Sequence, residues 1–192
     1  DALGLVVDRT LQEFGRIDVL VNGAAGNFLC PAAQLSPNGF RTVLEIDTAG
    51  TFNASRAVFD RWFSEHGGNI INISATLHYG STPLQVHAAA AKSAVDALTR
   101  TLAAEWGPAG VRINAIAPGP IDETEGIARL LPQPTRARLE GTIPIRRMGR
   151  IDEIAKVALF LAADASSLVH GEILVADGGA WLTGSRLVAM PA

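Results

Sequence analysis

Short apolar runs alternate with helix-length segments along this chain of 192 residues, and this alternation limits the folds it can adopt. The apolar runs, bounded by glycine, proline and polar residues, read as buried strands at 17–21, 67–74, 110–120 and 171–179. The longer segments have helical patterns at 1–14, 36–66, 84–106 and 151–162. Helices that connect short buried strands are typical of βαβ units. The sequence therefore predicts an α/β fold with a doubly wound parallel sheet, covered by helices on both faces.

The start of the chain reads as an amphipathic helix rather than as a targeting signal. It has no initiator methionine, no basic segment and no apolar core of the kind found in signal peptides. Gly15 follows as a candidate C-cap, and the apolar spacing comes from Leu3, Val6, Val7, Thr10, Leu11 and Phe14. We therefore expect residues 1–192 to form a single domain that is the C-terminal portion of a longer chain.

Composition excludes several classes of partner. The chain is 48% hydrophobic and 18% charged, which is ordinary for a globular protein. Its formal net charge of −3 gives no reason to expect binding to nucleic acid or to an anionic membrane. Cys30 is the only cysteine, so an intrachain disulfide is excluded and a reducing compartment is expected. No apolar run approaches the roughly 20 residues that span a bilayer.

Five motifs occur in a fixed order: DVLVNGAAG, NIINISA, AAAAKSAVDALTRTLAAE, RINAIAPGPI and VADGG. This ordered set resembles the short-chain dehydrogenases/reductases over nearly the whole chain. It corresponds to the end of their N-N-A-G strand, their catalytic-serine strand, their Y-x-x-x-K helix and the P-G loop beside the nicotinamide. The resemblance implies a Rossmann-like fold that binds a nicotinamide cofactor. It also implies that the first strands and the Gly-rich loop of the family are missing from these residues.

The chain departs from the family pattern at three positions of the active site. In the family, a serine and a tyrosine donate to the substrate oxygen, while a lysine binds the cofactor ribose and lowers the tyrosine pKa. Here Lys92 is kept, but the tyrosine position is Ala88 and the serine position is Ala75. The asparagine of the central helix is replaced by Asp47. Without both donors, ordinary carbonyl reduction would lack a proton source.

One branch of the family shares these departures, the peroxisomal type of 2,4-dienoyl-CoA reductase. The chain resembles it in NGAAGNFLCPA, IDTAGTFN, LQVHAAAAK, EWGPAGVRINAIAPGPI and LVADGGAWLT. The resemblance implies reduction of a 2,4-dienoyl-CoA to a 3-enoyl-CoA by NADPH, in the degradation of unsaturated fatty acids. Hydride addition to a conjugated thioester gives a dienolate, which is far less basic than an alkoxide. The dienolate needs hydrogen-bond donors at its oxygen and a proton at its α-carbon, and water can deliver that proton, so a tyrosine at the reacting atom is not required.

The resemblance implies catalytic roles for Asp47, Lys92 and Asp177. Lys92 would bind and orient the ribose, although a solvated helix lysine is the plain alternative. Asp47 would position the protonating water or donate directly, unless it is only a buried, hydrogen-bonded helix residue. Asp177 either takes part in the reaction or serves the structure of a turn.

The remaining site residues also follow from the resemblance. Cofactor contacts are expected from Asn22, Ala24, Gly26, Lys92, Pro118, Gly119, Pro120, Ile121 and Thr124. Substrate contacts are expected from Phe28, Ser36, Asn38 and Arg129. A guanidinium suits the phosphates of a CoA thioester, but Arg129 could equally be a solvated arginine.

The four histidines suggest no further site. His87 titrates near neutrality, but adjacent helix residues point about 100° apart, so it should not fill the place of the missing tyrosine at Ala88. The other histidines show no metal-ligand spacing, and no metal is expected.

Two other functions stay open: a ketoacyl or enoyl reductase with a relocated acid, and a cofactor-binding module whose chemistry has lapsed. The family forms tetramers through two long helices, here 38–65 and 84–106, so we expect a homo-oligomer. The C-terminal AMPA is not a peroxisomal signal of the S-K-L type. The expected location is therefore peroxisomal or cytoplasmic.

Overall fold

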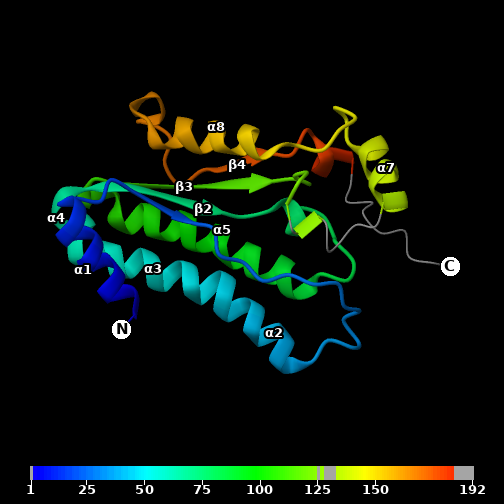
Figure 1. The fold of residues 1–192 in the computed structure, drawn as a ribbon, viewed down its shortest axis with the longest axis horizontal. Coiled ribbons are helices and arrows are strands. Elements are labelled where there is room, and N and C mark those ends of the chain that lie inside the picture. Colours follow the sequence, from blue (N-terminus) through cyan, green and yellow to red (C-terminus); the bar gives the residue numbers. More distant parts are fainter. Residues whose placement is uncertain (1, 125, 128–132, 184–192) are drawn as a thin grey trace.

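The computed structural model describes residues 2–124, 126–127 and 133–183 (Figure 1). A parallel sheet lies at its centre, with its strands in the order β1-β2-β3-β4. The strands are β1 (Val19–Asn22), β2 (Gly68–Ile73), β3 (Val111–Pro118) and β4 (Ile173–Ala176). All four predicted strands are present within a few residues of their expected bounds. The predicted α/β fold with a parallel sheet is confirmed.

Helices cover both faces of the sheet, as Figure 1 shows. On one face lie α1 (Ala2–Phe14), α5 (Val86–Trp106) and a continuous helical stretch from Pro37 to His66. That stretch contains α2 (Pro37–Leu44), the π-helical turn η1 (Glu45–Ala49), α3 (Gly50–Val58), a second π-helical turn η2 (Phe59–Phe63) and α4 (Ser64–His66). On the other face lies α8 (Ile151–Ala162). None of the helices in the described part of the chain is both long and apolar enough to cross a bilayer.

Both faces of the central strands are buried, which explains why these strands read as continuous apolar runs. Toward α1, α3 and α5, the core contains Phe63, Ile70, Leu102, Trp106 and Ile113. Toward α8, Ile71 and Ile116 pack with Leu161. Successive residues of a strand point to opposite faces, so Ile70 and Ile71 belong to different halves of the core.

A line of polar side chains crosses the core and fixes the end of β1. Asn22 Nδ2 donates to Ser55 Oγ at 3.0 Å and to Asn72 Oδ1 at 2.8 Å. Asn72 Nδ2 in turn donates to Thr99 Oγ1 at 2.9 Å. Buried amides are tolerated only where they are hydrogen-bonded, so this line sets the relative positions of β1, β2, α3 and α5.

The first helix forms as predicted, but its apolar pattern is only partly buried. Gly15 ends it with φ +74° and donates its N–H to Leu11 O at 2.9 Å, which confirms the expected C-cap. Val7 is buried, and Leu11 packs against the same cluster. Val6 and Phe14, by contrast, are 62% and 69% exposed. They cannot reach the core because only one narrow face of α1 rests on α3.

The segment before residue 150 holds a helix that the sequence analysis did not predict, α7 (Gln133–Thr142). Its sequence has a weak apolar pattern, so periodicity gives little sign of it. Leu139, Ile143 and Met148 form a small separate core there. This packing, rather than helix propensity, holds the segment in place.

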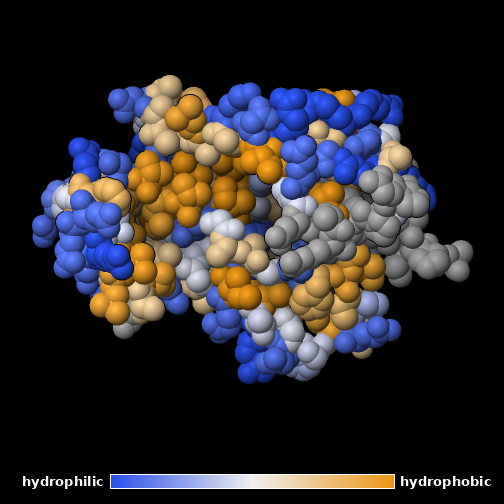
Figure 2. Space-filling view, in the orientation of Figure 1, coloured by the Kyte–Doolittle hydropathy of each residue, from blue (hydrophilic) through white to orange (hydrophobic). Residues whose placement is uncertain are grey.

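Apolar surface gathers over the strands between α8 and the helices of the opposite face (Figure 2). Strand β1 is the edge of the described sheet, and its Val19 and Val21 are 38% and 53% exposed. An edge strand offers unpaired backbone groups together with these side chains.

Phe63 allows a test of which packing stabilises the fold. Its side chain is fully buried between the helices and the sheet. Phe63→Ala should lower the free energy of unfolding by about 3–5 kcal/mol, because it removes a large apolar ring and leaves a cavity. Leu168 is 96% exposed, so Leu168→Ala should change it by less than about 0.5 kcal/mol. Urea denaturation of both variants checks this, and equal effects would contradict the assigned core.

Candidate active site

Candidate functional residues gather where the parallel strands end. The segments after β1, β2, β3 and β4 all emerge at the carboxyl edge of the sheet. Open parallel sheets bind their ligands at this edge. Lys92 reaches it from α5, and Asp47 reaches it from η1.

Asp47 and Lys92 form a buried ion pair there. The Lys92 Nζ lies 3.2 Å from Asp47 Oδ2 and donates a hydrogen bond to Ile73 O, the last residue of β2, at 2.9 Å. The other carboxylate oxygen, Asp47 Oδ1, accepts the N–H of Gly26 at 2.7 Å. Asp47 is 1% exposed and Lys92 is 7% exposed. Charges this deep require partners, and each is the partner of the other.

A local irregularity of the helix places Asp47. The π-helical turn Glu45–Ala49 interrupts the helix at this residue, and such bulges often occur at functional sites. Thr51 Oγ1 donates to Asp47 O at 2.6 Å, and Thr48 Oγ1 donates to Ala91 O of α5 at 3.3 Å. The second bond ties the turn to the helix that carries Lys92.

The two positions where the family has donors offer no hydroxyl. Ala88 lies one turn before Lys92 on α5 and is 2% exposed, and Ala75 follows the end of β2. The only tyrosine of the chain is Tyr79, which packs beside Ala115, Ala117 and Ile173. Burial raises the pKa of Tyr79, and the charge of Asp96 raises it further. Its phenol is therefore held protonated, whereas a lysine beside the family's tyrosine lowers the pKa of that phenol.

Asp177 has a structural role in the turn after β4. Its carboxylate accepts the backbone N–H of Gly179 and that of Trp181, each at 2.8 Å. A Cβ on Gly119 would lie only 2.6 Å from the Asp177 Cβ. The turn therefore packs directly against the P-G loop, which needs glycine at this place.

The P-G loop, which runs from Pro118 to Ile121 at the end of β3, is held by hydrogen bonds to neighbouring segments. Gly119 N donates to Ala176 O at 3.2 Å, and Gly149 N donates to Pro120 O at 3.0 Å. Ile121 forms a parallel bridge with Gly149. Thr124 Oγ1 donates to Ile121 O at 2.8 Å, so this hydroxyl helps to shape the loop.

The expected contacts near β1 divide into two kinds. Asn22 belongs to the polar line of the core, and the N–H of Gly26 is occupied by Asp47. Both groups are therefore engaged in hydrogen bonds within the protein and support the site structurally. Ala24 is exposed beside them and carries no polar side chain.

The expected substrate residues lie around the start of α2. Phe28 is 39% exposed and stacks on His87 with ring centroids 4.2 Å apart. Ser36 caps the helix, because its Oγ accepts the N–H of Gly39 at 3.0 Å. Asn38 is exposed in the first turn. Arg129 lies outside the described residues.

Sequence reasoning missed a second buried carboxylate, Asp96. It is 2% exposed, accepts Ser74 Oγ at 2.5 Å and pairs with His78 Nε2 at 2.8 Å. Its spacing of four residues from Lys92 was the available signal, since such residues share a helix face. Ser74 contacts the carboxylate and not the imidazole, so the cluster does not have the order of a nucleophilic triad. Asp96 therefore holds the segment after β2 through Ser74 and His78. The sequence alone had given no reason to single out His78.

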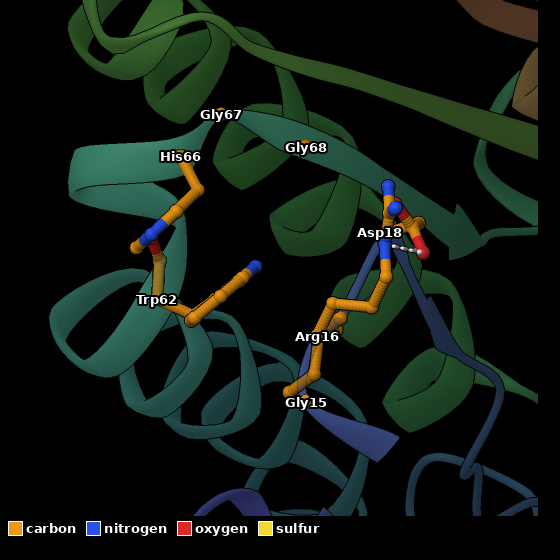
Figure 3. Close-up of a pocket in the computed structure, with 8 residues that line it drawn as sticks. Gly15, Arg16, Asp18, Trp62, His66, Gly67 and Gly68 are labelled. Carbon is orange, nitrogen blue, oxygen red and sulfur yellow. Dashed lines mark hydrogen bonds and ion pairs between the residues drawn. The ribbon is translucent and has the colours of Figure 1, made fainter. Parts of the chain in front are cut away.

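Figure 3 shows a pocket of about 460 Å³ at the opposite edge of the sheet. Trp62 and His66 stack at 3.6 Å on one side, and the Arg16–Asp18 ion pair lies on the other. The arginine charge is thus already matched by a carboxylate.

Within the described ranges, no cluster of three or more His, Cys, Asp or Glu residues suits a metal ion.

Comparisons with known proteins agree with this architecture. The family model described as enoyl-(acyl carrier protein) reductase matches residues 1–180. A peroxisomal 2,4-dienoyl-CoA reductase [(3E)-enoyl-CoA-producing] from Danio rerio is 59% identical over 183 residues, which cover 94% of this chain and 60% of that protein. The chain thus spans about 60% of the length of this relative.

Solved structures show the same fold. A short chain dehydrogenase from Bacillus anthracis has a TM-score of 0.82 at 40% identity, covering 93% of this chain and 70% of that one. A gluconate 5-dehydrogenase from Burkholderia cenocepacia, solved in complex with NADP and tartrate, has a TM-score of 0.87 at 32% identity, with coverage of 93% and 70%. The extent of the family match and these identities lead to one conclusion: the chain belongs to the short-chain dehydrogenase/reductase family.

Proposed function

We propose that the chain is the C-terminal part of an NADPH-dependent reductase that converts 2,4-dienoyl-CoA to 3-enoyl-CoA in the degradation of unsaturated fatty acids. The observation that carries the proposal is the buried Asp47–Lys92 pair, 3.2 Å apart, in a site where Ala75 and Ala88 replace the usual donors. The name of the Danio rerio relative supports the same chemistry. The activity is proposed for the whole protein, since the chain spans about 60% of that relative.

The residues present fit a nicotinamide cofactor, which supplies a hydride when bound. Lys92 has three N–H donors, of which one reaches Ile73 O and another faces Asp47. The third can bind a ribose hydroxyl. The loop Pro118–Ile121 and Thr124 would border the nicotinamide side, and Asn22, Ala24 and Gly26 the adenosine side. The complex of the Burkholderia cenocepacia enzyme with NADP supports NADPH as the form used.

Asp47 and Lys92 together would handle the proton. Asp47 Oδ2 carries the ion pair but has no hydrogen-bond partner among the described residues. It can accept a hydrogen bond from a water, which the Lys92 ammonium helps to orient. Such a water can deliver a proton to the α-carbon of the dienolate, and the hydroxide that remains can take a proton from the Lys92 ammonium, which solvent then restores. Asp177 supports the neighbouring loop, and both of its oxygens serve the turn.

The substrate would enter beside α2. Phe28 offers an exposed apolar ring for the acyl chain, and Ser36 and Asn38 offer exposed polar groups at the start of the helix. Arg129 would bind the phosphates of CoA.

The proposal extends to the assembly of the whole protein. Preceding residues would add strands to the exposed edge at β1 and supply the Gly-rich loop, which completes a single Rossmann-type domain over this chain and those residues. Copies would associate through the helical stretch Pro37–His66 and through α5 into a homo-oligomer. A peroxisomal location follows the name of the Danio rerio relative, with the cytoplasm as the alternative.

Asp47→Asn tests the proton step. In the whole protein, the variant should reduce the kcat for a 2,4-dienoyl-CoA by about 100-fold or more, the usual loss when a group that handles a proton is removed. Binding of NADPH, measured by fluorescence titration, should persist. Asp60→Asn is the matched control, because Asp60 lies on the same helical stretch but is exposed and paired with Arg56.

The wild-type protein separates the candidate functions in the same assay. Turnover of a 3-ketoacyl-CoA in place of the dienoyl-CoA would indicate a ketoacyl reductase with a relocated acid. Binding of NADPH without turnover of either substrate would indicate a cofactor-binding module. Undiminished dienoyl-CoA turnover in Asp47→Asn would remove Asp47 from the mechanism.

Ala88→Tyr tests whether the site has merely lost its acid. Ala88 is 2% exposed, so a phenol there must displace packed atoms, which costs about 1–3 kcal/mol of stability. We expect a lower midpoint of thermal unfolding and no gain of 3-ketoacyl-CoA reduction. Ala155→Tyr, at an exposed position of α8, should leave the midpoint unchanged. A stable Ala88→Tyr protein that reduces ketoacyl-CoA would show that the alanine alone sets the chemistry.

A further inference from the structure

His87 is a buried imidazole for which the mechanism above has no use. It lies in the first turn of α5, five residues before Lys92, and it is fully buried. Its ring lies nearly parallel to that of Phe28, at an interplanar angle of 19°. It therefore faces the segment after β1, in agreement with the expectation that it does not fill the tyrosine position.

Burying the imidazole of His87 at this position lowers the stability of the fold. Neither ring nitrogen has a hydrogen-bond partner among the described residues. Burial, the largest influence, lowers the pKa of His87, while the backbone of Phe28 and the charge of Asp47 act in the opposite direction. A ring used only for packing would be apolar, because an unpartnered buried polar group loses its hydration without compensation. The one specific contact that the ring makes among the described residues is its stack on Phe28.

The segment opposite His87 is held at three points. Gly26 N donates to Asp47 Oδ1 at 2.7 Å, and Cys30 N donates to Leu84 O at 2.9 Å. Between these backbone ties, the ring of Phe28 rests on His87. The outer ties fix the path of the main chain, but they leave the direction of the Phe28 ring to the stack.

Phe28 and its neighbour present apolar surface beside the Asp47–Lys92 pair. Phe28 is 39% exposed and Leu29 is 42% exposed, although the chain here is tied to the same carboxylate that pairs with Lys92. An aromatic ring whose underside is packed and whose other side is open forms a wall for an apolar ligand.

We propose that His87 is a positioning residue for the acyl chain of the substrate: its buried imidazole holds the Phe28 ring as the wall of the acyl site. This inference rests on the proposed function and deepens it, because it assigns the apolar side of the same site. His87 acts through Phe28 and does not itself touch the substrate.

The role depends on the neutral form of the imidazole. Since burial is the largest influence on its pKa, the folded protein binds a proton at His87 less readily than the unfolded chain does. The stabilising contribution of the stack is therefore complete above pH 6.5 and is lost as the pH falls through the lower pKa of the folded state. Asp47 of η1 is the ionisable side chain whose charge acts on His87; it favours the protonated imidazole and so counteracts part of the lowering of the pKa by burial.

Two substitutions at His87 distinguish the effect of ring stacking on the KM from the effect of protonating the imidazole. His87→Ala removes the stack, so in the whole protein the KM for a 2,4-dienoyl-CoA should rise about fivefold at pH 7.5 with kcat nearly unchanged. His87→Phe keeps a stacked ring that cannot be protonated. It should retain the wild-type KM at pH 7.5 and should lack any rise in KM that the wild type shows as the pH falls through the lowered pKa of His87.

His66→Ala is the matched control. It removes a second stacked histidine, which packs on Trp62 at the opposite edge of the sheet, and should leave the KM unchanged. The measurement is NADPH oxidation against dienoyl-CoA concentration from pH 5.5 to 8, after thermal unfolding has shown that each variant is folded. An unchanged KM in His87→Ala would overturn the inference, as would a wild-type pH dependence of the KM in His87→Phe. A wild-type protein without dienoyl-CoA turnover would instead overturn the proposed function, and the inference with it.

Discussion

The buried ion pair between Asp47 and Lys92 is the interaction on which the rest of the site depends. Removing two charges from water is expensive, and their mutual attraction offsets the cost only when further hydrogen bonds satisfy them. Ile73 O supplies one such bond to the ammonium, and Gly26 N supplies one to the carboxylate. The ends of β1 and β2, the π-helical turn and α5 must therefore all be in place before the pair can form.

The second carboxylate of this region extends the same constraint along α5. Lys92 and Asp96 lie one turn apart on the helix and hold consecutive residues at the end of β2, the carbonyl of Ile73 and the hydroxyl of Ser74. A helix that slid along its axis would break both contacts at once. The position of Lys92 at the site is thus held in part by Asp96, one turn further along the helix.

Most of the fold could be predicted because its signals are local. The apolar runs and the C-cap at Gly15 are read directly from neighbouring residues, and the structure confirms them. The carboxylate at Asp96 is indicated only by its spacing from Lys92, and the π-helical turn at Asp47 has no local signal, because tertiary contacts decide it. The helix α7 was missed for the same reason. The resemblance to a family predicted that Asp47 and Lys92 serve one site, but their ion pair was not predicted.

Removing a tyrosine from this scaffold changes which reaction the remaining charges can support. With a phenol present, a nearby ammonium favours the phenolate and makes the phenol a better acid. Here the ammonium faces a carboxylate, and the space at Ala88 is packed. The pair can still bind hydroxyls and orient a water, but it cannot offer a directed acid to a strongly basic alkoxide. A substrate that delocalises its negative charge onto a thioester removes that need, so the alanines and the ion pair are both consistent with the proposed class of substrate.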